Sequence, residues 1–540
     1  MIPTTKSSLT LAGFREGLIP NAISGFIVFL IALPLCLGIA MASDFPPFGG
    51  LITAIIGGLI VSLFAGSELT IKGPAAGLIA IAAISVETLG NGNAQSGYQL
   101  TLAVIVVASL IQIVFGLLKA GVLGDFFPSA SVHGMMAAIG IIIISKQIHP
   151  LMGVKAVSKE PFDLLAEIPH SISIHNPEIA IIGGISMAIL ILLPLINHPI
   201  IKKIPAQMIV ILVAIPLGHY FNLEQEHNYF FSPAQHTYSI GPKFLVSLPD
   251  NFIKGITFPD FSQIMSLTSI QYIVMFAMVG SLESMLTVKA IDLIDPQKRK
   301  ADPNRDLLAV GIGNTLCGLL GGLPMIAEVV RSSANVNNGA KNRWANWFHG
   351  LFLLIFLVFL PWLIVQIPLS ALAAMLVYTG YKLASPHHFI STLKIGKDQL
   401  IIFVVTIIVT LWTDLLLGIG AGLVVKLIMH LLSGASLSTL FRADIRIESY
   451  DNIHTVYIKR AAVFSNFMNF KSIVNSLPPS ERVIIDFSET RLMDHSFITQ
   501  LISLQKTWEK RNKILEFKGM EQLKPVSDHP MASRKLEVAI

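Results

Sequence analysis

The sequence contains little charge. Only 13% of its 540 residues are Asp, Glu, Lys or Arg, whereas a soluble globular domain carries about 25%. Hydrophobic residues make up 53% of the chain, and apolar runs follow one another closely from residue 19 to residue 433. Beyond Arg442 the sequence becomes polar and charged. This distribution excludes a simple soluble protein and predicts an α-helical polytopic membrane protein with a soluble C-terminal domain.

Cysteine and catalytic motifs are almost absent as well. Cys36 and Cys317 both lie in apolar runs, so we expect packing roles and no disulfide framework. The sequence contains no Walker loop, which argues against ATP as the driving force. It also contains no nucleophile–base constellation, so we expect neither enzyme activity nor a cofactor. The formal net charge of +5 reflects loop lysine and arginine, which membrane topology explains without a nucleic-acid partner.

The apolar runs can be counted as spans, because a helix needs about 20 residues to cross the hydrocarbon core. The sequence predicts fourteen runs, several of them too short to span alone. They are 21–42, 48–66, 73–86, 100–118, 131–146, 178–196, 204–218, 268–290, 306–320, 325–337, 344–360, 361–380, 399–412 and 414–432.

Positive residues orient these runs, since cytoplasmic loops carry the excess of Lys and Arg. With the N-terminus in the cytoplasm, Lys119, the "KRK" segment 298–300 and Lys341 all fall inside. The even count then places the C-terminal domain in the cytoplasm. We predict a transmembrane domain over 1–435, built from inverted repeats at about 15–218 and 260–435, and a cytosolic domain over 440–540.

The third run of each half is short and interrupted. Gly73-Pro74 opens one of them, and "GGLP" (321–324) precedes the other. Paired broken helices at equivalent places in two halves point to a transporter's binding site. A helix that begins inside the membrane carries about half a positive charge at its unpaired N–H groups, so two facing starts favour an anion. Pro74 suits a first helical turn, and we expect the half-helix to begin there. The alternative is two kinked helices in an ordinary bundle.

One acid stands alone in the eighth run. Glu283 has Ser284 beside it and Thr287 one turn further on. A carboxylate with nearby hydroxyls can bind Na⁺, and a desolvated carboxylate can instead carry a proton. We therefore predict a coupling-ion site of Glu283, Ser284 and Thr287, with a buried acid paired to a basic neighbour as the alternative.

Three more ionisable residues surround the broken helices, although an ionised side chain near the bilayer centre costs about 2.5–3.5 kcal/mol or more. Lys72 either attracts the substrate anion or forms a salt bridge with Glu328 that closes the site. Arg331 either contacts the substrate or belongs to a structural pair. The predicted substrate-binding residues are Lys72, Gly73, Pro74, Ala75, Ala327, Glu328, Val329 and Arg331.

Five segments are distinctive as a set: "ALPLCLGIAMA" (32–42), "KGPAAG" (72–77), "GSLESMLT" (280–287), "NRDLLAVGIGNTLCGLLGGLP" (304–324) and "RSSANVNNGA" (331–340). Together they resemble the sulfate permease family of secondary anion transporters. The resemblance covers nearly the whole chain in order. It implies a seven-plus-seven inverted repeat divided into core and gate domains, with the anion between the half-helices of spans three and ten. It further implies an elevator-like movement and a cytosolic STAS domain.

The resemblance also implies roles for particular residues. In sodium-coupled bicarbonate members, an acid and a threonine four residues apart on the eighth span bind Na⁺, which matches Glu283 and Thr287. Backbone at the start of the tenth span completes that site and matches Ala327, Glu328 and Val329. This chain departs from those relatives at two positions, with Lys72 in place of threonine and Glu328 in place of a small residue.

The C-terminal region is predicted to be α/β. "RVIIDFS" (482–488) and "KILEFKG" (513–519) are typical of buried strands, and Phe497, Leu501, Leu504 and Trp508 form an apolar helix stripe. "DFSETRLMDHSF" resembles the STAS loop that carries a phosphorylated serine, with Ser496 at that place. A structural helix cap after Asp494 is the alternative.

We therefore expect a secondary active transporter of a small inorganic anion, with bicarbonate favoured and sulfate next, coupled to Na⁺ or H⁺. We place it in a bacterial inner membrane, as a homodimer through the STAS and membrane domains. The alternatives are an anion exchanger, a channel-like anion conductor, a proton symporter of sulfate or dicarboxylates, a membrane sensor and a nucleobase permease.

Overall fold

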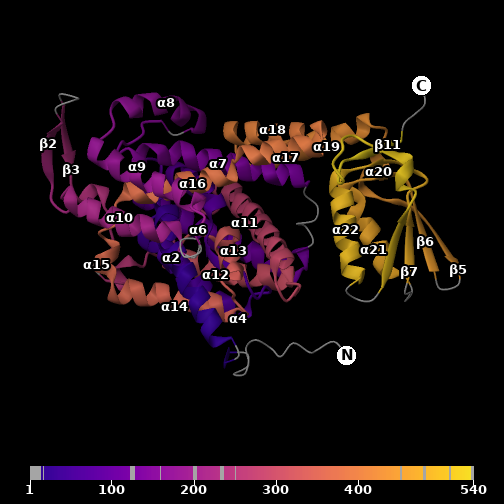
Figure 1. Cartoon of the computed structure of the whole chain (residues 1–540), viewed down its shortest axis with the longest axis horizontal. Coiled ribbons are helices and arrows are strands. Elements are labelled where there is room, and N and C mark those ends of the chain that lie inside the picture. The colour runs from indigo at the N-terminus through magenta and orange to yellow at the C-terminus, as the bar shows by residue number, and fades with distance from the viewer. Residues whose placement is uncertain are drawn as a thin grey trace. The chain divides into compact units, whose positions relative to one another are not determined.

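The computed structural model describes residues 14–536 except 16, 122–127, 159, 199–203, 232–235, 250, 451–452, 478–481 and 510–512. The chain forms two compact units (Figure 1). The first consists of Met1–Gly121 and Ile139–Leu383, and the second of Val122–Ala138 and Ala384–Ile540. The predicted division at residues 435–440 stays a prediction, and the second unit includes all of residues 384–540.

The first unit is almost entirely helical, and α7 continues from it into the second unit. Its helices are α2 (Leu18–Ala42), α3 (Pro47–Ile56), α4 (Ser62–Phe64), α5 (Ile79–Gly90), α6 (Ala94–Leu117), α7 (Ser129–Leu151), α8 (Pro161–Ser173), α9 (Pro177–Leu192), α10 (Ala206–Tyr220), α11 (Leu267–Ile294), α12 (Pro303–Leu320), α13 (Val329–Asn337), α14 (Trp344–Phe359), α15 (Pro361–Ile364) and α16 (Leu369–Leu383). A hairpin of β2 (His227–Phe231) and β3 (His236–Ile240) lies in the long loop between the two halves of the sequence.

Every one of the fourteen predicted runs contains a helix in the described part of the chain. Seven helices there are long and apolar enough to cross a membrane by themselves. They are Leu18–Ala42, Pro47–Phe64, Ala94–Leu117, Ser129–Leu151, Pro177–Leu195, Leu267–Ile294 and Leu415–Leu432. The prediction of an α-helical polytopic membrane protein is confirmed.

The two interrupted runs are the short helices α5 and α13, and each follows a short strand. β1 (Ile71–Pro74) precedes α5, and β4 (Met325–Glu328) precedes α13. One expectation here is wrong, because Pro74 ends a strand and the helix begins only at Ala76, with one 3₁₀ turn before Ile79. The extended backbone of β1 finds a partner in β4, and that pairing competes successfully with helix formation.

The packing of the first unit follows from its composition. One of its apolar clusters contains Leu37, Leu51, Ala54 and Leu353, all of them fully buried. Glycine allows the closest approaches, since a Cβ at Gly58 would collide with the backbone of Gly350. Small residues at helix contacts are the usual means of packing in a bilayer, where lipid removes the hydrophobic drive between helices.

The second unit combines membrane helices with an α/β domain. Its helices are α17 (Pro386–Ile395), α18 (Lys397–Trp412), α19 (Leu415–Leu432), α20 (Leu437–Phe441), α21 (Phe467–Ser476) and α22 (His495–Glu509). Its strands are β5 (Asp444–Tyr450), β6 (Ile453–Ala462), β7 (Arg482–Asp486), β8 (Thr490–Met493), β9 (Ile514–Lys518), β10 (Leu523–Pro525) and β11 (Arg534–Leu536).

These strands form one sheet in the order β10-β11-β8-β6-β7-β9, with β5 also paired to β6. The pairs of β6 with β7, β6 with β8, and β7 with β9 are parallel. In Figure 1, α21 and α22 run beside the strands. The predicted strands at 482–488 and 513–519 are confirmed as β7 and β9. The predicted stripe is also confirmed, because Phe497, Leu501, Leu504 and Trp508 of α22 are buried in the domain core.

Candidate functional site

The two broken spans meet where β1 pairs side by side with β4, a two-stranded arrangement called the crossing below. β1 and β4 are antiparallel, with Lys72 opposite Ala327 and Gly73 opposite Ile326. The backbone N–H of Ala75 extends the ladder by donating to the carbonyl of Pro324 at 3.1 Å. Extended backbone at membrane depth must be paired inside the protein. The crossing satisfies that requirement and brings the third and tenth spans together, as the sequence predicted.

Side chains from other spans hold the crossing in place. The Asn314 side chain accepts from the Met325 N–H at 2.5 Å and donates to the Met325 carbonyl at 3.1 Å and to Gln112 at 2.9 Å. Ser332 accepts from the N–H of Ile71 at 2.8 Å. The sequence reasoning missed these residues. Its available signal was that Asn314 and Gln112 are amides inside apolar runs.

The two half-helices start immediately beyond the crossing. Ala76 opens the 3₁₀ turn that leads into α5, and Val329 is the first residue of α13. Their first N–H groups lack partners within the helix and give each start a partial positive charge. Of the predicted substrate residues, Gly73 and Pro74 lie in β1, and Ala327 lies in β4.

Lys72 has a partner that the sequence reasoning did not consider. Its ammonium is fully buried, and Nζ lies 2.6 Å from Oδ2 of Asp306 in α12. The other Asp306 oxygen accepts from the N–H of Ser67 at 3.2 Å. The hypothesis of a salt bridge between Lys72 and Glu328 is therefore wrong, since the carboxylate that compensates this buried charge is Asp306. Asp306 opens the ninth run, where an isolated acid could have been noticed.

Glu328 points to the opposite half-helix. It is the last residue of β4 and occupies the position before the first turn of α13. Its Oε1 accepts from the N–H of Ala76 at 3.3 Å. A carboxylate of the tenth span thus lies at the positive start of the third-span helix, where an anion is stabilised.

Arg331 carries unused donors in the same region. Its side chain is 1% exposed, and Nη1 donates to the sulfur of Cys36 at 3.4 Å. Nε and Nη2 make no hydrogen bond within the described residues. The guanidinium lies against β1, because a Cβ at Gly73 would overlap Nη1. It also interacts electrostatically with Glu328 and with the buried His349. The sequence reasoning missed His349, although it is an ionisable residue inside an apolar run.

The predicted coupling-ion residues occupy one face of α11. Glu283 packs on the start of the third-span helix, where a Cβ at Gly77 would overlap its carboxylate. Oε2 of Glu283 has no hydrogen-bond partner within the described ranges. Ser284 accepts from the N–H of Ala327 at 3.2 Å, and Thr287 is buried one turn beyond Glu283. Glu283 interacts electrostatically with Glu328, so the two acids share one environment.

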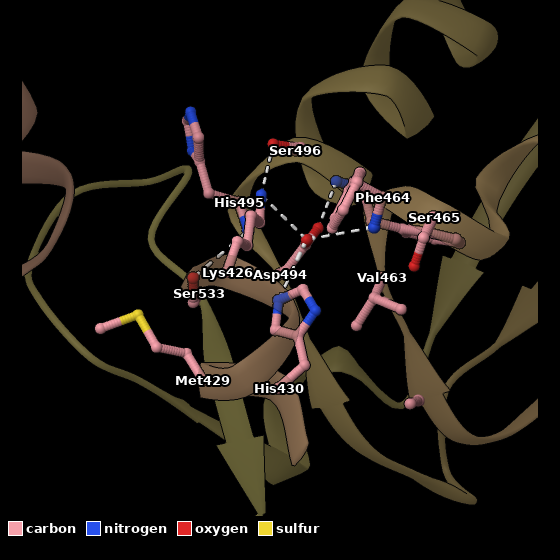
Figure 2. A network of polar contacts seen from close by, with 12 residues as sticks. Lys426, Met429, His430, Val463, Phe464, Ser465, Asp494, His495, Ser496 and Ser533 are labelled. Carbon is pink, nitrogen blue, oxygen red and sulfur yellow. Dashed lines mark hydrogen bonds and ion pairs between the residues drawn. The ribbon is translucent and has the colours of Figure 1, made fainter. Parts of the chain in front are cut away.

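A second polar cluster lies at the N-terminus of α22 (Figure 2). Asp494 accepts from the N–H of Phe497 at 2.6 Å and pairs with Lys426 of α19 at 3.1 Å and with His430 at 3.3 Å. Lys426 also donates to the Ser496 hydroxyl at 2.8 Å. Asp494 is therefore the helix cap, as one of the two interpretations predicted. Ser496 is buried against the last membrane helix.

The ionised form of Asp494 is favoured by this cluster. Burial raises the pKa of the carboxyl, but the positive Lys426, the neighbouring His430 and the N–H groups of Phe497 and Phe464 outweigh burial, and the pKa lies below its ordinary value. His495 lies beside Asp494 and faces away from this cluster, with Nδ1 at 2.7 Å from the carbonyl oxygen of Met531.

Comparisons with known proteins agree with the fold. The bicarbonate transporter BicA of Picosynechococcus sp. is 25% identical over 404 residues, which cover 74% of this chain and 68% of BicA. The solved transmembrane domain of a cyanobacterial BicA superposes with a TM-score of 0.62 at 22% identity, over 75% of this chain and 97% of that one. The structure of SLC26A9 gives a TM-score of 0.68 at 16% identity, over 95% of this chain and 86% of that one. The sequence matches the sulfate permease family over residues 18–406, and the chain therefore belongs to this family of anion transporters.

Proposed function

We propose that this protein is a secondary active transporter that moves a small inorganic anion together with Na⁺ or H⁺, with bicarbonate as the favoured substrate and sulfate as the next candidate. The anion is held between the starts of α5 and α13 and is carried by an elevator-type movement. The observation that carries this proposal is the balance of charge around the crossing of β1 and β4.

The balance can be counted from the contacts. Lys72 and Asp306 compensate each other as a close pair. Arg331 supplies one positive charge with two donors that are unused within the described residues, and Glu283 and Glu328 add two negative charges when both are ionised. A bound monovalent anion adds a third negative charge. At 4 Å, each pair of like charges is destabilised by about 4 kcal/mol at an effective dielectric constant of about 20. The anion therefore binds well only when a cation binds with it.

Glu283 is the proposed binding site for that cation. Its Oε2 is unpartnered within the described residues, and Thr287 lies one turn away on the same helix face. Together with backbone at Ala327 and Val329, these groups offer oxygen ligands to Na⁺. A proton on Glu283 would neutralise the same charge without further ligands.

Bicarbonate is favoured over sulfate because of charge. Each additional negative charge is repelled by Glu283 and Glu328, and a divalent anion would need two compensating cations. The relatives support both anions, since a bicarbonate transporter is 25% identical to this chain and a putative sulfate transporter of Bacillus subtilis is 26% identical. Sulfate stays the next candidate because of the family to which the chain belongs.

The remaining parts of the proposal concern the assembly. The α/β domain that begins at β5 has the strand and helix pattern expected of a STAS domain. We place this domain and the N-terminus in the cytoplasm of a bacterium, with the transporter in the inner membrane as a homodimer. Lysines and arginines in the loops support this orientation.

Uptake into proteoliposomes tests the transport function. The purified protein is reconstituted, and uptake of labelled bicarbonate and labelled sulfate is measured under an imposed Na⁺ gradient, an imposed pH gradient, and neither gradient. Bicarbonate accumulation driven by one of the gradients is expected. Transport only in exchange for internal anion would replace the coupled mechanism by an exchanger. No transport of either anion would refute the proposal.

Glu283→Gln tests the coupling. The amide keeps the shape of the side chain but cannot release a proton and binds Na⁺ poorly. We expect gradient-driven accumulation to be lost, while exchange of internal for external anion remains partly intact. Equal loss of both activities would assign Glu283 a structural role.

A further inference from the structure

We propose that Glu328 makes the anion site selective for oxyanions that carry an O–H group, of which bicarbonate is the physiological example. This inference rests on the proposed function and concerns how the same site distinguishes one anion from another. The observation is the position of the Glu328 carboxylate, which accepts from the N–H of Ala76 at the start of α5 and interacts electrostatically with Arg331.

The site presents both donors and an acceptor. Donors come from Nε and Nη2 of Arg331, which are buried and have no partner in the described part of the chain. The planar guanidinium favours two oxygens of one anion, each accepting an N–H. The acceptor is Glu328, whose carboxylate accepts one hydrogen bond from the described residues, that of the Ala76 N–H. An ionised carboxylate has about four lone-pair positions, so acceptor capacity is left over.

The backbone of Glu328 is held in this region by strand pairing. It ends β4, where it lies opposite Ile71, and the next residue begins α13. Its electrostatic partners there are Arg331 and Glu283. Any anion that contacts the Arg331 donors therefore approaches an acceptor as well.

An anion that has only acceptor oxygens cannot donate a hydrogen bond to Glu328, so its oxygens and the carboxylate repel each other. Nitrate, which is planar, singly charged and close in size to bicarbonate, is such an anion. Bicarbonate has two oxygens for Arg331 and an O–H that can be donated to Glu328. A site built to hydrogen-bond a substrate O–H rejects the analogue that lacks it by roughly 10⁴-fold when its polar groups are left unpaired. Nitrate keeps two oxygens that can accept from Arg331, so we expect a smaller factor of about 100-fold.

Competition in wild-type proteoliposomes is the first test. Uptake of labelled bicarbonate is measured at one pH against increasing unlabelled bicarbonate or nitrate. Half-inhibition by nitrate is expected at a concentration about 100-fold higher than that of bicarbonate. Equal inhibition by the two anions would overturn the inference, because discrimination by the O–H group would then be absent.

Glu328→Gln is the second test, because the amide removes the negative charge and replaces one of the two acceptor oxygens by an N–H donor. Discrimination between bicarbonate and nitrate is expected to fall to within about tenfold. Gly184→Ala is the control, since a Cβ at Gly184 meets nothing within 4 Å, and it is expected to keep the discrimination. Unchanged discrimination in Glu328→Gln would overturn the inference.

Binding to purified wild-type protein separates this inference from the transport mechanism. Thermal stabilisation by bicarbonate and by nitrate is compared in detergent, with no uptake required. Stabilisation by bicarbonate at much lower concentration supports the selectivity even if coupled transport is not observed. Equal stabilisation by both anions refutes it, whatever the transport assay gives.

Discussion

The buried pair of Lys72 and Asp306 gives a prediction that can be worked from the structure. Both side chains are almost completely buried, and their charged atoms are 2.6 Å apart. At an effective dielectric constant of about 20, their attraction is about 6 kcal/mol. Removing two ions from water costs several kcal/mol for each ion, so the net contribution of the intact pair is small. Breaking the pair is different, because it leaves one uncompensated charge inside the protein.

We expect Lys72→Met and Asp306→Asn each to destabilise the protein by about 3–5 kcal/mol. The amide oxygen that Asp306→Asn introduces can still accept from the N–H of Ser67, so the effect isolates the charge. The double variant contains no buried ion at this pair and is expected to recover most of this loss. The coupling energy between the two positions is then about 3 kcal/mol or more.

Denaturant-induced and thermal unfolding in detergent measure this cycle. All four proteins are compared in one buffer, with and without bicarbonate. Losses that add to within about 0.5 kcal/mol would refute the reasoning, because additivity means that the two residues do not interact. If Lys72 instead bound the substrate directly, Lys72→Met would abolish stabilisation by bicarbonate, whereas Asp306→Asn would leave it unchanged.

Two further predictions test other contacts. Gly77→Ala places a Cβ on the Glu283 carboxylate, so we expect gradient-driven uptake to fall on the order of tenfold or more. Gly184→Ala is the control, since its Cβ meets nothing within 4 Å, and equal loss in both variants would contradict the explanation. The second prediction concerns Asp494, whose pKa is lowered in the folded protein. The stability that its carboxylate contributes is therefore fully present above the unfolded-state pKa of about 3.9. That stability is lost as the pH falls through the lower pKa of the folded state. Asp494→Asn leaves Lys426 uncompensated, so we expect a lower unfolding temperature at pH 7. We also expect a smaller loss of stability as the pH falls below about 4. An unchanged dependence of stability on pH would refute this assignment.

Local chemistry explains why much of the site could be predicted. The breaks before α5 and α13 are marked by Gly73-Pro74 and by Gly321–Pro324, which are poor helix formers wherever they occur. Glu283 and Thr287 lie four residues apart, and a helix of any tertiary context places them on one face. These features depend only on neighbours in the sequence.

Pro74 shows where local reasoning fails. A proline suits the first turn of a helix, and it also tolerates the end of a short strand, because it has no N–H to pair in either place. The strand formed because β4, about 250 residues away, offers an extended partner. In the bilayer, unpaired backbone is costly, so the presence of that partner decides the conformation.

The sequence by itself determined the membrane spans, the two broken helices and the α/β character of the C-terminal domain. Bilayer thickness and hydrophobic periodicity set these features, and both can be read along the chain. Only the tertiary structure decided that Lys72 is compensated by Asp306, that Glu328 faces the start of α5, and that two donors of Arg331 have no partner among the described residues. Charge compensation in a low-dielectric interior is a matter of distance in space, and chain segments more than 200 residues apart supply the partners.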